Sequence, residues 1–424
     1  MKKTLPTCGP AAAKLAAASK PAATSKAKPK QSTARLLLLP DLTGIAAALA
    51  APLANWFLHA RRDLPWRSGF HAGPGKPPIG EACRDPWVAL MAEAMLQQTQ
   101  VSRVIEYLAR FAARFPTPAS MAAAPEAEVL AMWSGLGYYR RARNLKRCAD
   151  EITRHHGGRV PSSFDALLEL PGLGRYTAGA LASIVFGYAE PIVDGNVARV
   201  LLRIGGKPLD PAAKATTTLL WAQAQQLADA SDSPGLVNEA IMELGALVCT
   251  PKAPRCAQCP LATCCRAAAL GKQDQIPPAK LRAARIAIEL QTAVLADCAG
   301  RILLQQRPAT GLWAGMWQTP TVELGAAGTL ADLLGARAAD VRKVSGFLHQ
   351  TTHRSVHISI FTLDVPGKLT AKAAAKIRAS VIRIGGAPCL WMHPSEFGKL
   401  GMSNAAKRAI KLAAAPQLPA TVAR

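Results

Sequence analysis

The sequence predicts a multi-domain chain in which an all-α core is followed by a smaller α+β domain. Its 424 residues are too many for one ordinary hydrophobic core, so two or three domains are expected. From residue 86 to about 265, apolar residues recur at three- and four-residue spacing, which is the period of packed helices. Beyond residue 280, apolar and polar residues alternate as they do in half-buried strands.

The chain is basic in its tail and in its body. Net charge is +24, and residues 1–35 hold eight lysines and arginines and no acid, which leaves +16 for the rest. We predict a disordered tail at 1–35 and nucleic acid as the main partner, with a merely soluble basic surface as the alternative. Ten cysteines without an export signal suggest a reducing compartment, so we expect a cytoplasmic, DNA-associated monomer.

The helical domain is predicted to span residues 36–270. Its first apolar run, 36–58, is interrupted by prolines and polar residues, so it predicts a helix rather than a membrane span, and no membrane partner is expected. Glycines and prolines separate the helices that follow. These are expected at 87–103, 104–115, 126–133, 140–155 and 164–170.

One acid lies within the apolar body of the segment 85–100. Glu93 has Leu90, Met91 and Met95 among its neighbours. A carboxyl in such surroundings is poorly solvated, so its pKa should rise until it can donate a proton near neutrality. A partly exposed helix residue is the alternative.

The segment LPGLGRYTAG (170–179) joins two helices by a turn that contains two glycines. Gly172 and Gly174 let the backbone come close to a ligand, and N–H groups of the turn and the following helix point outward. Such a turn can bind a DNA phosphate without reading sequence. An ordinary helix connection is the alternative.

A second acid, Asp194, precedes a helix in PIVDGNVARV (191–200). It can cap that helix by accepting backbone hydrogen bonds, and a carboxylate held in this way stays ionised. The same properties suit a group that opposes positive charge on a sugar. Glu93 and Asp194 would then divide the work as the two carboxyl groups of glycoside cleavage do.

Four cysteines between residues 249 and 265 indicate an inorganic centre. Their spacing is Cys249-x6-Cys256-x2-Cys259-x5-Cys265, with one CxxC pair followed by proline. Zinc ribbons usually use two such pairs, so an iron–sulfur cluster held by four thiolates fits better than structural zinc or disulfides. Cys264 adjoins Cys265, and either is a candidate for the fourth ligand.

The composition changes at GKQDQIPPAK (271–280), which predicts a linker over 271–285. Residues 287–307 predict a β-hairpin turning near 297–300, and the alternation at 356–361 predicts another strand. Ser403 is expected to cap a basic final helix. We therefore expect an α+β domain at 286–416 and a tail at 417–424.

Six strings resemble adenine DNA glycosylases of the MutY type, which belong to the endonuclease III or helix-hairpin-helix superfamily. They are LPWR (64–67), MLQQTQV (95–101), GLGYYRRARN (135–144), PGLGRYTAGA (171–180), DGNVARVL (194–201) and NEAIMELGALVC (238–249). The resemblance runs from about residue 53 to the end, apart from an insertion at about 68–83 and a divergent C-terminal half.

The resemblance implies a base-excision repair enzyme. It would flip adenine out of double-stranded DNA, where adenine lies opposite 8-oxoguanine or guanine, and hydrolyse the N-glycosidic bond. The helix-hairpin-helix would lie at about 164–187. The 6-2-5 cysteine spacing resembles the family's cluster loop, which implies a [4Fe-4S] cluster in the loop 249–265 with Cys265 as the fourth ligand.

The family's motifs also imply roles for matching residues. Glu93 matches the acid that protonates adenine N7, and Asp194 matches the carboxylate that stabilises an oxocarbenium-like sugar. Tyr176 and Asn196 match residues that place these groups. The pocket for the flipped adenine is matched by Trp66, Arg67, Leu96 and Glu239. The residues inserted at the mismatch are matched by Gln98, Thr99, Leu136 and Tyr138.

Tyr176 decides the type of reaction. Lyase-competent relatives have a lysine at this position, whose amine attacks the sugar, and a phenol cannot do so. We therefore expect a monofunctional glycosylase. The rivals are a thymine–guanine mismatch glycosylase of the same superfamily and a non-catalytic iron–sulfur DNA-binding or redox-sensing protein.

The stretch GLWAGMWQTP (311–320) resembles the Nudix-like C-terminal domain of the same glycosylases. Between 311 and 335 the acids are Glu323 and Asp332, too few for the magnesium site of a Nudix hydrolase, so recognition is the expected use. The family's loop that contacts 8-oxoguanine reads Phe-Ser-His. Its match here is Thr351-Thr352-His353, which keeps a hydroxyl and an imidazole but lacks the aromatic ring. An ordinary polar hairpin loop is the alternative, and any contact with a processivity clamp is left open.

Overall fold

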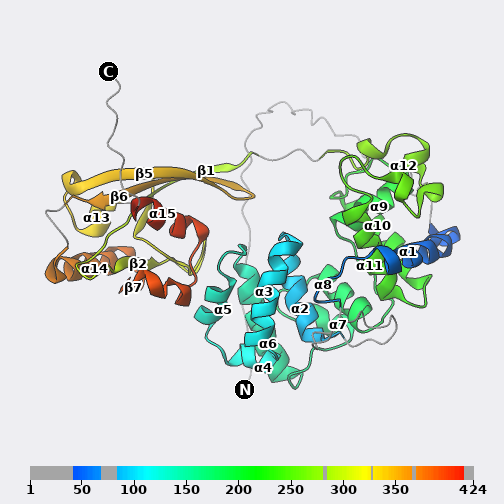
Figure 1. The fold of residues 1–424 in the computed structure, drawn as a ribbon, viewed down its shortest axis with the longest axis horizontal. Helices are drawn as coiled ribbons and strands as arrows, with labels where there is room; N and C mark the ends of the chain where they lie inside the picture. Colours follow the sequence, from blue (N-terminus) through cyan, green and yellow to red (C-terminus); the bar gives the residue numbers. More distant parts are fainter. Residues whose placement is uncertain (1–41, 68–83, 280–283, 326–327, 365–368, 415–424) are drawn as a thin grey trace, which may run out of the picture. The chain divides into compact units, whose positions relative to one another are not determined.

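The computed structural model describes residues 42–67, 84–279, 284–325, 328–364 and 369–414. Within these ranges helices fill the chain up to Ala269 and strands begin at Ile286, which confirms the predicted order of an all-α part and an α+β part (Figure 1). None of the helices in the described ranges is long and apolar enough to cross a membrane. The predicted tails at 1–35 and 417–424 and the insertion at 68–83 lie outside them.

The helices of the first part are α1 (Ala46–Ala60), α2 (Pro86–Leu96), α3 (Val101–Arg114), α4 (Pro118–Ala123), α5 (Glu126–Trp133), α6 (Arg140–His155), α7 (Phe164–Glu169), α8 (Arg175–Ala180), α9 (Gly195–Ile204), α10 (Lys214–Asp229), α11 (Pro234–Leu247) and α12 (Arg266–Ala269). A π-helical turn, Leu181–Val185, extends α8.

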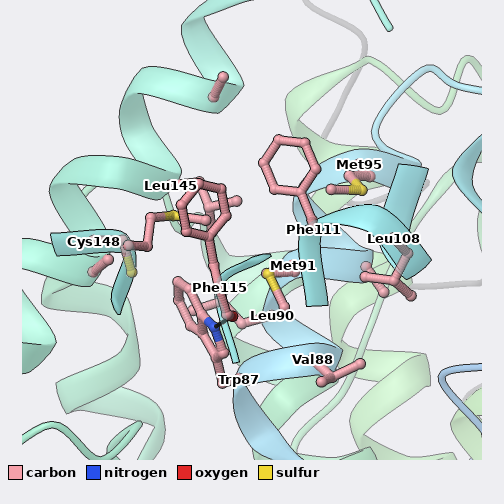
Figure 2. Packing of buried hydrophobic residues seen from close by; sticks show 14 of the residues in the cluster. Trp87, Val88, Leu90, Met91, Met95, Leu108, Phe111, Phe115, Leu145 and Cys148 are labelled. Atoms are coloured by element: carbon pink, nitrogen blue, oxygen red, sulfur yellow. Dashed lines mark hydrogen bonds between the residues drawn. The ribbon is translucent and has the colours of Figure 1, made fainter. Parts of the chain in front are cut away.

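Two hydrophobic clusters hold these helices together. In the first, residues of α2, α3 and α6 pack around Phe111 and Phe115, and the Trp87 indole N–H donates to the Phe115 carbonyl at 2.9 Å (Figure 2). The second joins α1, α9, α10 and α11 and includes Ile276 of the segment predicted as a linker. Both clusters consist mainly of buried apolar side chains, and their packing is the main source of stability for such helices.

The predicted helix over 87–103 is wrong in one respect, because the structure divides it. Helix α2 ends at Leu96 and α3 begins at Val101. Between them Gln98 has φ +58°, a left-handed conformation that cannot continue a right-handed helix. Residues 97–100 therefore form a polar turn at the end of α2.

The α+β part contains two sheets. The first has the order β4-β1-β6-β5 and the second the order β3-β2-β7. Pairing of β1 with β6 is parallel, and the other pairings are antiparallel. The strands are β1 (Ile286–Ala293), β2 (Ile302–Gln306), β3 (Trp317–Gln318), β4 (Thr321–Glu323), β5 (Val341–Gln350), β6 (Arg354–Leu363) and β7 (Cys389–Met392).

The predicted hairpin at 287–307 is only partly present. Its turn forms at 297–300, where Gly300 N–H donates to the Asp297 carbonyl at 3.0 Å. However, β1 belongs to the first sheet and β2 to the second, because β2 pairs with β3 and β7 instead of β1. The strand predicted around 356–361 is confirmed as part of β6.

Helices cover the strands on two sides. Alanines of α15 (Asn404–Ala414) pack against Leu304 and the buried residues of β6, while α13 (Leu330–Leu334) and α14 (Ala371–Gly385) pack against Ala293 and Leu303. The Ser403 hydroxyl accepts from Ala406 N–H at 3.1 Å, so the predicted cap of the final helix is present. Figure 1 shows α15 beside β5 and β6.

Candidate active site and DNA interface

Helix α2 carries Glu93 into the helical part. The helix starts where the Asp85 carboxylate accepts from Trp87 N–H and Val88 N–H at 2.8 and 3.1 Å, with Pro86 in its first turn. The apolar side chains of α2 are buried in the first cluster (Figure 2), and Glu93 is half-buried.

The surroundings of Glu93 make it a weak acid that is protonated near neutrality. Burial raises the pKa of its carboxyl to about 7, and the charges of Glu239 and Asp194 add to the rise. A hydrogen bond from Tyr176 and the charge of Arg84 act in the opposite direction. This is the direction expected from the sequence, and the four groups that act on the carboxyl, two raising and two lowering its pKa, come from four separate segments.

Asp194 caps helix α9 as the sequence predicted. Its Oδ1 accepts from Val197 N–H at 2.7 Å, and its Oδ2 accepts from Asn196 Nδ2 at 3.0 Å. The carboxylate is thus held from two sides at the N-terminus of a helix, where a negative charge is favoured.

Arg199 links this carboxylate to the cysteine loop. Its Nη2 donates to Asn196 Oδ1 at 2.8 Å, and its Nε donates to the Cys249 carbonyl at 2.7 Å. A chain of hydrogen bonds therefore runs from Asp194 through Asn196 and Arg199 to the first predicted cluster ligand.

Tyr176 lies on α8 and is close enough to both acids for their charges to act on its phenol. Burial raises the pKa of its phenol well above the ordinary value, and the charges of Glu93 and Asp194 raise it further. Its hydroxyl lies 3.2 Å from Met242 Sδ of α11. The phenol therefore remains a neutral hydrogen-bond donor beside both carboxyl groups.

An ion-pair network surrounds the next two acids of the site, Glu239 and Glu243. Arg84 donates to the two oxygens of Glu239 at 3.0 and 2.6 Å, and Arg67 Nε donates to Oε1 at 3.1 Å. Arg67 also donates to Glu243 at 3.2 and 3.1 Å, and Arg62 donates to Glu243 at 2.8 and 2.7 Å. Sequence reasoning had identified Arg67 and Glu239 but missed the other three.

Glu239 and Glu243 are almost fully buried, with 4% and 1% of their surface exposed. Burial alone would raise the pKa of Glu243, but hydrogen bonds from Arg62 and Arg67 outweigh it and bring the pKa to about 2. Removing one arginine would leave a buried charge poorly compensated. Trp66 and Leu96, the other two expected pocket residues, both pack against the first cluster.

Two turns carry the residues expected at the mismatch. In the turn after α2, Gln98 is exposed and Thr99 is half-buried. In the turn between α5 and α6, Tyr138 is 43% exposed with φ +48°, whereas Leu136 is buried at 7%. Leu136 is thus a packing residue in this structure.

The predicted hairpin joins α7 to α8. Gly172 has φ +85°, and a Cβ at this position would lie 2.5 Å from the Asn144 Cβ, so a side chain is excluded. Gly174 is exposed at the N-terminus of α8. Such an exposed helix N-terminus after a tight turn is able to bind a phosphate.

The four predicted cluster ligands lie near one another. Burial raises the pKa of the Cys259 thiol to about 11, and the charges of Cys249, Cys265 and Cys256 contribute to this rise. Cys249, Cys259 and Cys265 pack against the second cluster, whereas Cys264 is exposed. In the described ranges, no three His, Cys, Asp or Glu side chains are arranged to hold a metal ion.

A donor set of four thiols nevertheless fits an iron–sulfur cluster chemically. The loop is fixed by Arg203, whose Nη1 donates to Cys249 Sγ at 3.3 Å and whose carbonyl accepts from Cys265 Sγ at 3.4 Å. Cys264 takes no part in these contacts, and its sulfur lies 3.8 Å from Thr263 Oγ1.

The segment Thr351-Thr352-His353 forms the turn between β5 and β6. Thr351 closes the turn, with its N–H donating to the Arg354 carbonyl at 2.9 Å and its hydroxyl accepting from Arg354 N–H at 3.0 Å. Thr352 and His353 are exposed. The Thr352 hydroxyl contacts the hydroxyl of Tyr138, so residues expected at the mismatch and at the lesion meet.

Comparisons with known proteins agree with these features. Residues 91–226 match the HhH-GPD superfamily of base excision DNA repair proteins, and residues 291–412 match the NUDIX domain. Adenine DNA glycosylase from Homo sapiens is 32% identical, covering 86% of this chain and 74% of its own length. The one from Mycolicibacterium smegmatis is 43% identical, and the match covers 50% of this chain and 67% of that protein. Among solved structures, a thermostable thymine-DNA glycosylase is 28% identical with a TM-score of 0.46, covering 54% of this chain and all of its own.

Proposed function

Because the chain belongs to the adenine DNA glycosylase family, we propose that Glu93 and Asp194 perform its reaction. The reaction of the family is removal of adenine from DNA. The observation that carries the residue assignment is the raised pKa of Glu93, about 7, beside a second carboxylate that caps a helix. One carboxyl able to give a proton and one able to oppose positive charge are what glycosidic bond cleavage requires.

In the proposed mechanism adenine is flipped into the pocket beside Trp66 and Glu239. Protonated Glu93 donates its proton to adenine N7. The bond between the sugar and adenine breaks, and its electron pair leaves with the base. The sugar becomes oxocarbenium-like, and the Asp194 carboxylate opposes its positive charge. Water then adds to the sugar, its extra proton passes to the Glu93 carboxylate, and an abasic site remains.

The same geometry supports a monofunctional enzyme. Tyr176 lies beside the two carboxyl groups, where lyase-competent relatives would have an amine, and its phenol stays neutral because its pKa is raised. A phenol of this kind can position Glu93 and Asp194 by hydrogen bonding but cannot form a Schiff base.

The proposed substrate is double-stranded DNA containing adenine opposite 8-oxoguanine or guanine. The turn with Gly172 and Gly174 would bind the phosphate backbone, and the mismatch would be filled from the turns of Gln98 and Tyr138. Thr352 and His353 would hydrogen-bond the oxidised base.

We also propose that Cys249, Cys256, Cys259 and Cys265 hold a [4Fe-4S] cluster. When bound, the cluster would supply structural support, since it would fix a loop that bears Lys252, Arg255 and Arg266. Arg199 and Arg203 of α9 already anchor the Cys249 end of this loop, and the Arg203 carbonyl accepts from Cys265 Sγ at its other end. The proposed domain limits are 36–270, 271–285 and 286–416.

The decisive experiment measures adenine release under single-turnover conditions, as strand cleavage by alkali, on A·8-oxoG, A·G and T·G duplexes. We expect release from the first two. Glu93→Gln should retain mismatch binding but lose about 10²–10⁴-fold in rate, because an amide has no proton of suitable acidity. Near-wild-type turnover of this variant would contradict the assignment of Glu93. Release of thymine instead would favour the rival glycosylase, and binding without base release would favour a non-catalytic sensor.

A further inference from the structure

Arg141, on the first turn of α6, is a buried cation with unusual partners. Only 9% of its surface is exposed. The five hydrogen bonds it makes within the described residues go to uncharged oxygens rather than to a carboxylate. Burial lowers the pKa of Arg141 to about 10, so its guanidinium remains charged at neutral pH.

One end of the guanidinium binds the C-terminal end of α2. Its Nη1 donates to the carbonyls of Ala94 and Met95 at 3.0 and 2.7 Å, and its Nη2 donates to Thr99 Oγ1 at 3.0 Å. The last carbonyls of a helix have no partner within the helix, and a cation is favoured there. Arg141 therefore anchors the turn 97–100 to the end of α2 through a buried contact.

The same Nη2 reaches the turn that follows α5. It lies 3.3 Å from the Gly137 carbonyl and 3.5 Å from the Leu136 carbonyl. The guanidinium also lies 5.3 Å from the ring centres of Trp133 and Tyr138. One side chain thus ties together two turns that are about 40 residues apart in the sequence.

Each of these turns holds a residue in a strained conformation. Gln98 has φ +58° and Tyr138 has φ +48°, and neither is a glycine. A left-handed residue of this kind persists only where its surroundings enforce it, and such strain concentrates at functional sites. Among the residues that the structure describes, Arg141 is the side chain that hydrogen-bonds both turns.

We propose that Arg141 is a positioning residue for adenine excision: its buried guanidinium locks the turns 97–100 and 135–138 into one arrangement that is ready to enter the mismatch before DNA binds. The proposal rests on the assignment of these turns to the mismatch. Its energetic effect is preorganisation. Because the two turns are already ordered in the free protein, DNA binding does not bear the entropic cost of ordering them.

Arg141→Lys tests the proposal directly, because lysine keeps the charge but cannot bridge both turns. Arg147→Lys is the matched control, since Arg147 is exposed on the same helix. Amide hydrogen exchange of the intact proteins without DNA should show lost protection at 97–100 and 134–139 in Arg141→Lys only. Reporter amides are Thr99 N–H and Leu136 N–H, which donate to Leu96 and Trp133.

Protection in α9, which belongs to the other cluster, should remain unchanged in Arg141→Lys. Unchanged exchange in both turns would overturn the proposal. An equal loss in α9 would also overturn it, because Arg141 would then be a general folding residue.

A pair of substrates separates positioning from chemistry. On A·G, Arg141→Lys should excise adenine about tenfold more slowly, which corresponds to ~1.4 kcal/mol. On adenine opposite an abasic site, where no opposing base holds the adenine in place, its rate should approach that of the wild type. Equal slowing on both substrates would contradict a role in base displacement. An inactive wild type would refute the proposed function, whereas the exchange experiment would still test the link between the turns.

Discussion

Glu93 depends for its chemistry on side chains from four other segments. Glu239 of α11 and Asp194 before α9 raise its pKa, while Tyr176 of α8 and Arg84 before α2 lower it. Burial is the largest influence, and a value of about 7 is the balance of all five. Because the proposed mechanism uses protonated Glu93, the excision rate should fall as pH rises through this pKa. A change in a charged neighbour should shift the pH at which the rate falls.

Arg84→Gln is expected to move the alkaline fall in rate to higher pH. Loss of the Arg84 charge removes an influence that lowers the pKa of Glu93, so the carboxyl should stay protonated further into the alkaline range. Arg67 still donates to Glu239 in this variant, so Glu239 retains a cationic partner. The measurement is the single-turnover excision rate on A·G between pH 5 and 9.

Two further variants make this prediction specific. Arg84→Lys should leave the alkaline fall close to its wild-type position, because it retains the positive charge. Arg337→Gln removes an arginine that donates to both oxygens of Asp340 on an exposed surface, and it should leave the profile unchanged. A shift to lower pH in Arg84→Gln would mean that Arg84 acts on the site in another way.

Tyr176→Lys should introduce strand-nicking activity that the wild type lacks. The new amine would lie beside the proposed acid and carboxylate, where it can attack the sugar and form a Schiff base. Borohydride trapping of the protein on A·G duplex is the measurement. Efficient trapping by the wild type would mean that another lysine attacks the sugar, and the protein would not be monofunctional.

The residues of the site differ in how well the local sequence predicts them. Glu93 and Asp194 stand in short strings whose apolar or capping context is local, so the burial of the first and the capping role of the second followed from nearby residues. Arg62 and Arg84 contact acids 181 and 155 positions away, and no local pattern records such pairs. Glu243 did leave a signal, since it lies one turn after Glu239 in an apolar helix, where two buried acids require cations.

At the scale of elements, the cysteine loop gives a direct test of ligand identity. Cys265 lies against the second cluster beside Cys249 and Cys256, and its thiol donates to the Arg203 carbonyl, whereas Cys264 is exposed. Cys264→Ser should therefore keep iron, while Cys265→Ser should lose most of it. Iron content and visible absorption of the purified proteins are the measurements. Iron lost from Cys264→Ser but kept in Cys265→Ser would reverse the assignment.

Element boundaries were predictable only where the signal was local. The start of α2 follows from Asp85 and Pro86, and the cap of α15 from Ser403. The end of α2 did not follow, because Gln98 turns left-handed in a segment whose Thr99 accepts from Arg141, which lies far along the chain. The hairpin at 287–307 failed for a similar reason. Its turn is local, but the strands on each side are assigned to different sheets by partners from 317–323, 354–363 and 389–392.

At the scale of the whole molecule, the residues proposed for chemistry and those proposed for lesion recognition lie in different parts of the chain. The residues proposed for catalysis lie before residue 250, whereas Thr352 and His353 lie in the turn between β5 and β6. A protein divided in this way can lose its preference among mismatches without losing its reaction. The net charge of +24 would hold both parts on DNA through contacts that do not depend on sequence and weaken with salt.

Deletion of residues 281–424 is therefore expected to retain adenine release from A·G and to reduce the preference for A·8-oxoG. A few hydrogen bonds of about 1 kcal/mol each correspond to a preference of one to two orders of magnitude. Met316 packs in the first cluster, so the truncated protein should also be less stable, and its helicity must be measured beside its activity.

Full-length Thr352→Ala/His353→Ala is the matched control, because it removes the proposed lesion contacts while Met316 stays in place. Single-turnover rates and binding on both duplexes at one fixed salt concentration are the measurements. If the double variant keeps the full preference, the turn between β5 and β6 does not read the lesion. If the truncated protein keeps it as well, the helical part discriminates 8-oxoguanine from guanine by itself.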